Sequence, residues 1–197
     1  MKIAIDLDGV VFNSEMFFMA SGELYDAMIL GKNSIVKPDE PRVQNKYSWS
    51  DEELQGYIER YSRSLDFDVM PCAKIVIDEL KRDNELFVVS ARGQFSEEEI
   101  TIARRKLDEA GITFHHYFFG HLDKRQIVRD LGIDVMIDDR YDVCEDLSRM
   151  GVLSLYFRMA GRRELEESEL VKEVNNWGEV YRVLRDRGII GGKNEED

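Results

Sequence analysis

The chain has 197 residues, of which 43% are hydrophobic and 10% aromatic, so it can bury one core of ordinary size. Its 27 basic and 40 acidic residues give a net charge of −13, which repels nucleic-acid phosphates and argues against binding to DNA or RNA polymers. No apolar run approaches the roughly 18 residues that span a bilayer, so we expect no membrane association. Two cysteines are too few for a disulfide framework and no signal-type segment opens the chain, so we expect a cytoplasmic protein with free thiols.

Short segments rich in Ile, Val and Phe alternate with helical patterns along most of the chain. Five such segments are typical of strands: residues 2–6, 86–90, 114–119, 134–138 and 152–157. Four helical patterns lie between the later ones: residues 71–84, 96–111, 123–132 and 141–151. Pro71 suits the first turn of its helix, and Ser96 and Glu99 have the spacing of a capping box. This alternation predicts an α/β fold: a Rossmann-like parallel sheet of about five strands with helices on both faces.

The interval between the first strand and Pro71 is about 58 residues long, which far exceeds an ordinary loop between a strand and a helix. Two helices fit inside it. One covers residues 14–30 and ends at Gly31, and the other begins at Ser50, which has Glu53 in capping-box spacing. The stretch between these helices, which contains two prolines, is predicted to be a loop.

An insertion at the carboxyl end of a parallel strand overhangs the edge where such sheets bind ligands. We therefore interpret residues 14–70 as a small α-helical cap inserted after the first strand. The core is then formed by residues 1–13 and 71–190. The polar residues 191–197 are expected to be a disordered tail.

Charged and hydroxyl side chains stand where the predicted strands end or where the next helix begins. They are Asp6, Asp8, Ser90, Lys124, Asp138 and Asp139. Taken singly, each has a simple structural explanation as a turn, a helix cap, a strand-end hydroxyl or a solvated lysine. Together they put four carboxylates and one ammonium in one crevice, because the carboxyl ends of parallel strands share one edge. A divalent cation with oxygen ligands, Mg²⁺, would balance this charge.

The segments "DLDGVVF", "VVSAR" and "DKRQIVRDLGIDVMIDD" carry these residues in order over residues 3–139, and the chain resembles the haloacid dehalogenase superfamily in all four signature elements. The resemblance implies a Rossmann-like core and Mg²⁺-dependent phosphoryl transfer through an aspartyl-phosphate. True dehalogenases of that superfamily need no metal and lack an acid at the position of Asp8. The resemblance therefore favours a phosphatase.

Roles for individual residues follow from the same resemblance. Asp6 would be the nucleophile and a metal ligand, and Asp8 would be the general acid and base as well as a metal ligand through its main-chain carbonyl. Lys124 would neutralise charge on the transferring group and on Asp6. Asp139 would hold Mg²⁺ directly and Asp138 through water, although the sequence cannot order these two. The phosphate would lie against Gly9, Ser90, Ala91, Arg92 and Lys124. Arg92 could instead reach the cap or pair with a surface acid.

The segments "DLDGVVFN", "SAR", "IDDR" and "NNWGEVYRVL" resemble the 5′-nucleotidase branch of the superfamily, which includes the cytosolic and mitochondrial deoxyribonucleotidases. Four aromatic residues of the predicted cap could stack on a base: Phe17, Phe18, Tyr47 and Trp49. Trp49, in a polar stretch, is the candidate for substrate contact. Phe17 and Phe18 could equally fasten the cap helix to its neighbour.

We therefore expect an enzyme, a Mg²⁺-dependent phosphomonoester hydrolase acting on (deoxy)ribonucleoside 5′-monophosphates. The alternative is a phosphatase or phosphomutase for sugar phosphates or other small metabolites. A non-catalytic or phosphoreceiver-like signalling module is a remote alternative, because phosphoreceiver domains place their phosphorylated aspartate after the third strand and this chain has none there. The expected partner is a small phosphorylated metabolite, and a homodimer is left open.

Overall fold

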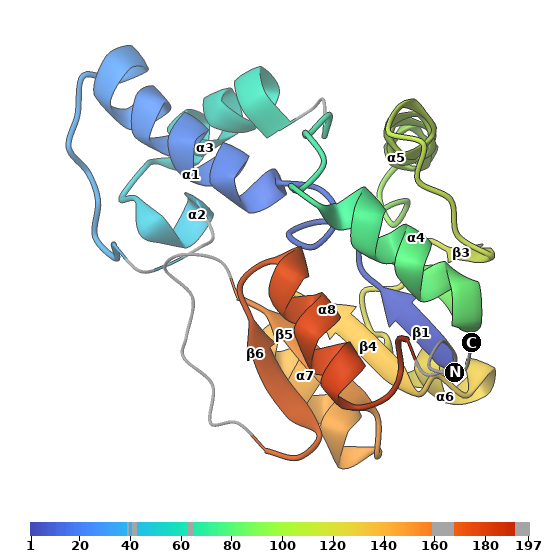
Figure 1. The fold of residues 1–197 in the computed structure, drawn as a ribbon. Helices are drawn as coiled ribbons and strands as arrows, with labels where there is room; N and C mark the ends of the chain where they lie inside the picture. Colours follow the sequence, from blue (N-terminus) through green and yellow to red (C-terminus); the bar gives the residue numbers. More distant parts are fainter. Residues whose placement is uncertain (39, 41–42, 63–64, 159–167, 192–197) are drawn as a thin grey trace.

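The computed structural model describes residues 1–38, 40, 43–62, 65–158 and 168–191. Its centre is one six-stranded sheet in the order β3-β2-β1-β4-β5-β6 (Figure 1). The strands are β1 (Lys2–Ile5), β2 (Glu85–Val89), β3 (His116–Phe118), β4 (Val135–Asp138), β5 (Leu153–Phe157) and β6 (Val171–Val174). All five pairings are parallel, so the prediction of a Rossmann-like parallel sheet is confirmed.

The sixth strand is the element of the sheet that was not predicted. β6 has the sequence VKEV, in which only Val171 and Val174 are buried. It lies at the edge of the sheet, where it pairs with β5 alone. A four-residue segment with two charged residues has too little apolar patterning to stand out as a strand. Residues 192–197, most of the predicted tail, lie outside the described residues.

Helices cover both faces of the sheet, as predicted. They are α4 (Ala73–Asp83), α5 (Glu97–Glu109), α6 (Arg125–Leu131), α7 (Tyr141–Arg149) and α8 (Trp177–Asp186). Apolar residues of α4, α5 and α8 share a core with Ile3 and Ile5 of β1, whereas those of α6 and α7 pack on the other face with Ala4. The alternation along β1 follows from the two-residue period of a strand.

Two of the predicted helix starts differ from the structure. Helix α4 begins after Cys72, which has a left-handed backbone (φ +66°), so Pro71 precedes the helix and does not lie in its first turn. The capping box predicted at the start of α5 is wrong. Ser96 accepts a hydrogen bond from the backbone N–H of Glu98, and the Glu99 carboxylate accepts one from the N–H of Gly93.

The inserted segment forms a second group of helices beyond the carboxyl end of β1 (Figure 1). Helix α1 (Ser14–Leu24) continues as a π-helical turn, η1 (Tyr25–Ile29), and α3 (Asp51–Tyr57) continues as η2 (Ile58–Ser62). The capping box of Ser50 and Glu53 at α3 is confirmed. A short helix, α2 (Val43–Lys46), lies in the stretch that was predicted to be a loop.

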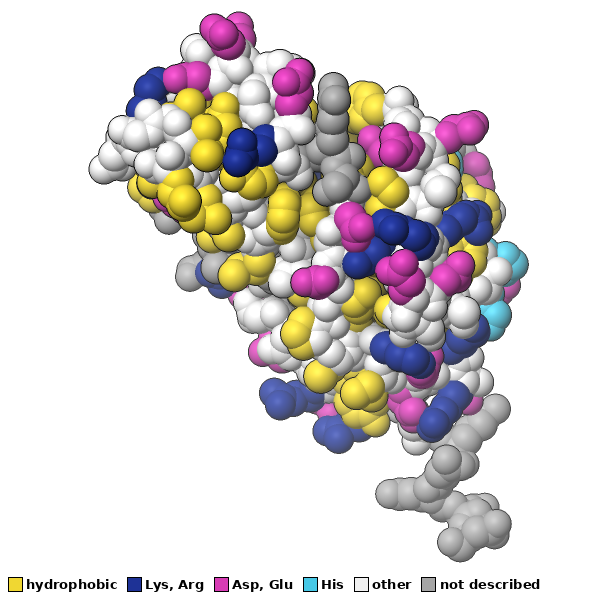
Figure 2. Space-filling view, turned by 90° about the horizontal axis from the view of Figure 1, so that it is seen from above, with side chains coloured by type: hydrophobic (Ala, Val, Ile, Leu, Met, Phe, Trp, Pro, Cys, Tyr) yellow, Lys and Arg dark blue, Asp and Glu magenta, His cyan; other side chains and the backbone are white. Residues whose placement is uncertain are grey.

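We refer to α1, η1, α2, α3 and η2 as the cap helices. They enclose a small core of their own, formed by Tyr25, Val43, Tyr47 and Tyr57. Several apolar side chains of the cap helices are exposed: Met16, Leu24, Met28, Ile29 and Ile58. Figure 2 shows hydrophobic side chains gathered over this part of the molecule. Within the described ranges, no helix has the length and apolar character needed to cross a membrane.

The two chain segments that connect the cap helices to the sheet run beside each other. The N–H of Asn13 donates to the carbonyl of Asp68 at 2.8 Å, and the N–H of Met70 donates to the carbonyl of Val11 at 2.8 Å. Between these bonds Phe12 and Val69 form an antiparallel bridge. The base of the cap is therefore a paired double strand next to the end of β1.

Candidate active site

Asp6 is the first residue after β1, and its backbone N–H extends the strand pairing by donating to the carbonyl of Ile137 at 3.0 Å. The side chain is buried, with 7% of its residue surface exposed. Its Oδ2 lies 3.1 Å from Nζ of Lys124, which precedes α6 and is also buried. Lys124 Nζ in turn donates to Asp138 Oδ2 at 2.6 Å. One ammonium thus joins acids from the ends of β1 and β4.

Three of the predicted metal ligands form one buried carboxylate cluster. Asp6, Asp138 and Asp139 each place an oxygen within 4.8 Å of the others. Asp138 Oδ2 accepts from Lys124, and its Oδ1 accepts from the backbone N–H of Arg140 at 2.9 Å. Asp6 Oδ1 is buried and has no hydrogen-bond partner in the part of the chain that the structure describes. A buried carboxylate oxygen without a donor is costly, and a hard cation would satisfy it.

The electrostatics of the cluster agree with this geometry. Burial raises the pKa of Asp6 from 3.8 to about 6 even though Lys124 opposes the change, and the charges of Asp138 and Asp8 raise it further. Burial alone would lower the pKa of Lys124, but Asp138 and Asp6 outweigh it and raise that pKa above its ordinary value. The lysine therefore stays charged, and its single charge does not fully compensate the acids.

Gly9 lies where the loop after β1 passes the carboxylate of Asp139. Its φ is +73°, a conformation that side chains other than hydrogen disfavour. A Cβ at this position would lie 2.3 Å from Asp139 Oδ2. Glycine is thus required here for the close approach between the backbone and the Asp139 carboxylate.

The segment after β2 contributes two buried polar side chains, the hydroxyl of Ser90 and the guanidinium of Arg92. Ser90 is buried, and with Ala91 it lines the cavity described below. Arg92 is also buried, but it is not among the residues that line the cavity, and it donates two hydrogen bonds to Asp8, of 2.7 and 2.6 Å. In the structure the guanidinium of Arg92 pairs with Asp8, and a direct contact of Arg92 with phosphate stays a prediction.

Several of the site residues described above form the floor of a cavity of about 600 Å³. Asp6, Asp8, Ser90, Lys124 and Asp139 line it from the sheet side. The cap helices line it mostly with apolar side chains: Phe18, Val43, Leu54, Tyr57 and Ile58. The cavity thus combines a charged floor with an apolar roof.

Trp49 contacts other residues of the cap, and a contact with substrate stays a prediction. Its ring stacks on Tyr47 at 4.3 Å between centroids, and its Nε1 donates to Asp26 Oδ1 at 2.7 Å. It packs against the core of the cap helices and is not among the residues that line the cavity. Of the other aromatic residues, Phe17 and Phe18 both pack on Phe67, as the packing alternative proposed, while Phe18 also lines the cavity.

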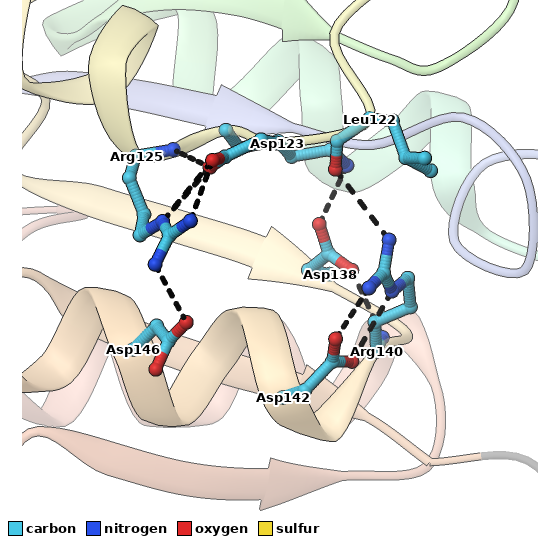
Figure 3. A network of polar contacts seen from close by, with 8 residues as sticks. Leu122, Asp123, Arg125, Asp138, Arg140, Asp142 and Asp146 are labelled. Carbon is cyan, nitrogen blue, oxygen red and sulfur yellow. Dashed lines mark hydrogen bonds and ion pairs between the residues drawn. The ribbon is translucent and has the colours of Figure 1, made fainter.

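Four polar residues of the cavity were not predicted as site residues: Ser14, Glu15, Gln44 and Arg140. Gln44 lies in α2, which the sequence did not reveal, and Glu15 carries no motif. Arg140 had a signal, since it directly follows the two acids of "IDDR". Its guanidinium pairs with Asp142 of α7 and lies 3.5 Å from the carbonyl of Leu122 at the rim of the cavity (Figure 3).

No protein-family model matches the chain. A nucleotidase of Clostridium acetobutylicum is 25% identical over 190 residues, which cover 93% of this chain and 93% of the relative. A protein of Halalkalibacterium halodurans that is provisionally named a nucleotidase is 21% identical over 182 residues, covering 91% of this chain and 90% of the relative. The crystal structure of a haloacid dehalogenase-like family hydrolase from Xanthomonas campestris matches with a TM-score of 0.62 at 12% identity, over 94% of this chain and 95% of that chain.

Proposed function

We propose, from the haloacid dehalogenase-like fold of this chain, that it is a Mg²⁺-dependent phosphomonoester hydrolase whose substrates are nucleoside 5′-monophosphates. The observation that carries the proposal is the buried cluster of three carboxylates beside Lys124, at the floor of the cavity between the sheet and the cap helices. Such a cluster is costly to bury without a cation, and it lies where a phosphate would enter.

The residues present fit a magnesium ion. Asp6 and Asp139 would be its side-chain ligands, and the main-chain carbonyl of Asp8 would be a third. Asp138 would stand behind them, because Lys124 and the N–H of Arg140 already occupy both of its oxygens. When bound, the ion would neutralise the acids and polarise a phosphoryl oxygen.

The chain's own residues divide the reaction into two displacements. Asp6 forms a bond to phosphorus while the ester P–O bond breaks, and Asp8 gives a proton to the departing oxygen. Asp8 then takes a proton from the water that hydrolyses the aspartyl-phosphate. Ser90 donates to a phosphoryl oxygen, and Lys124 offsets the negative charge that gathers on the transferring group.

The cap helices support a nucleoside as the leaving group. The aromatic residues Phe18 and Tyr57 line the cavity, and a base that stacks on an aromatic ring gains about 1–3 kcal/mol. The amide of Gln44 can both donate to and accept from the edge of a base. A volume of about 600 Å³ lies within the range of small-molecule sites. The similarity to two proteins named as nucleotidases points the same way. We keep the expectation of a cytoplasmic enzyme whose partner is a small metabolite.

The test is phosphate release by the purified chain with Mg²⁺ on matched panels of nucleoside monophosphates and sugar phosphates. We expect hydrolysis of nucleotides that stops in EDTA. Asp6→Asn should abolish it while the variant still unfolds cooperatively, and Asp78→Asn, an exposed acid on α4, should not change it. A preference for sugar phosphates by orders of magnitude would overturn the nucleotidase proposal alone. Failure to hydrolyse any monoester would overturn the phosphatase proposal as well.

A further inference from the structure

We infer that Arg92 is a positioning residue that holds the Asp8 carboxylate toward the leaving group and ties this carboxylate to the base of the cap. The inference rests on the proposed function, since it concerns how the proton reaches the departing oxygen.

The contact between the two side chains fixes direction as well as distance. Arg92 Nε donates to Asp8 Oδ2 at 2.7 Å, and Nη2 donates to Oδ1 at 2.6 Å. Two parallel bonds from a planar guanidinium fix the plane of the carboxylate, which a single ammonium cannot do. The Arg92 side chain is only 2% exposed, whereas that of Asp8 is 37% exposed and lines the cavity. The arginine therefore acts on substrate only through Asp8.

The guanidinium of Arg92 also contacts two aromatic rings near the base of the cap. It lies 4.8 Å from the centroid of Phe12 and 5.6 Å from that of Phe67. These two residues belong to the paired segments that connect the cap helices to the sheet. Phe67 also packs against Phe18 of α1 at 5.2 Å, and Phe18 lines the cavity. Unbroken contacts thus run from the cavity roof through Phe67 and Arg92 to Asp8.

A purely structural role explains this arrangement less well. A buried ion pair contributes little net stability, because desolvation of the charges offsets their attraction. The remaining donor atom, Nη1 of Arg92, is buried without a hydrogen-bond partner among the described residues, which adds a further cost. An apolar residue packed between Phe12 and Phe67 would suit the fold at least as well. This cost is explained if Arg92 serves to orient the Asp8 carboxylate toward the leaving group.

The chemistry of the leaving group separates a role of Arg92 in positioning Asp8 from a purely structural role. A nucleoside 5′-oxygen is strongly basic and needs the proton of Asp8 as its bond to phosphorus breaks. The oxygen of p-nitrophenyl phosphate leaves as a stable anion and needs no proton. The ratio kcat/KM covers only the steps up to departure of the leaving group, so water attack on the aspartyl-phosphate does not enter it.

The experiment compares kcat/KM for a nucleoside monophosphate and for p-nitrophenyl phosphate in Arg92→Met and Arg92→Lys. We expect the nucleotide value to fall by about 10²–10⁴-fold, the usual contribution of a general acid, and the aryl value to fall by less than about tenfold. Asp8→Asn should show the same bias, and adding Arg92→Met to it should lower the nucleotide value no further. Arg82→Met, on the exposed side of α4, is the matched control and should change neither value.

Equal losses on both esters would overturn the inference and leave Arg92 a structural residue. Phe67→Leu tests the connection to the cap without touching the charges, and it serves even if an Arg92 variant fails to fold. It should lower the nucleotide value several-fold more than the aryl value. Equal effects in Phe67→Leu would overturn the role of the cap. A wild-type chain that hydrolyses neither ester would instead overturn the proposed function.

Discussion

Replacing Asp6 by asparagine should make the protein more stable while it abolishes turnover. The carboxylate of Asp6 is buried beside two other acids and one of its oxygens lacks a hydrogen bond among the described residues. An amide of the same shape carries no charge, and its oxygen can still accept from Lys124. The substitution therefore removes the cost of burying a charge and keeps most of the packing.

The pKa of Asp6 gives the size and the pH window of this effect. It is about 6 in the folded chain, against 3.8 for an ordinary aspartate. Since a tenfold change in proton affinity corresponds to about 1.4 kcal/mol, ionising Asp6 costs about 3 kcal/mol more in the fold than in the unfolded chain. The folded chain holds the proton longer, so the wild-type protein loses stability as the pH rises from about 4 to about 6. The variant has no such loss.

Urea unfolding in EDTA at pH 5 and pH 8 measures the difference. We expect Asp6→Asn to be about 1–3 kcal/mol more stable than wild type at pH 8, and to have about half of that advantage at pH 5. Mg²⁺ should then stabilise wild type more than the variant. A variant that is less stable than wild type at pH 8, or equally favoured at both pH values, would refute the reasoning. Asp78→Asn should show no pH-dependent gain.

Three other substitutions test separate parts of the site. Lys124→Met leaves buried carboxylates without their cation and should lower the free energy of urea unfolding by about 3–5 kcal/mol, so a change below 1 kcal/mol would contradict the charge balance. Gly9→Ala pushes a methyl group against Asp139 and should weaken Mg²⁺ binding in calorimetry by about 10- to 100-fold; unchanged affinity would separate this loop from the metal site. Trp49→Phe loses the bond to Asp26 and should cost about 1.5–3 kcal/mol in stability with KM for nucleotides unchanged. A raised KM would place Trp49 at the substrate site.

Much of the core of this site is visible in the sequence because two simple rules combine. Short, continuous apolar segments mark β1 and β4, and parallel strands bring their carboxyl ends to one edge. Asp6, Lys124 and Asp139 stand at or near these ends, so their meeting follows from local pattern and topology alone. The capping box at Ser50 is equally local, since both of its partners lie within one turn of helix.

Several features of the cap and of the sheet edge do not follow from local sequence patterns. Trp49 stands in a polar stretch, which made it the candidate for substrate contact, yet its side chain donates a hydrogen bond to Asp26, 23 residues earlier in the chain. Helix α2 and its Gln44 have too few residues to show a helical period, and β6 is a short edge strand. Each depends on neighbours that come from elsewhere in the sequence.

Arg92 and Asp8 illustrate the same division within the site itself. Their sequence positions show that both lie near the edge of the sheet, but 84 residues separate them and nothing local pairs them. Their two hydrogen bonds depend on how the loop after β1, the loop after β2 and the base of the cap pack around one guanidinium. The sequence by itself determined five of the six strands, their shared edge and the acids that meet there, because those follow from short-range patterns. Only the tertiary structure decided which side chain aims which acid and which cap residues face the cavity, because those depend on packing between distant segments.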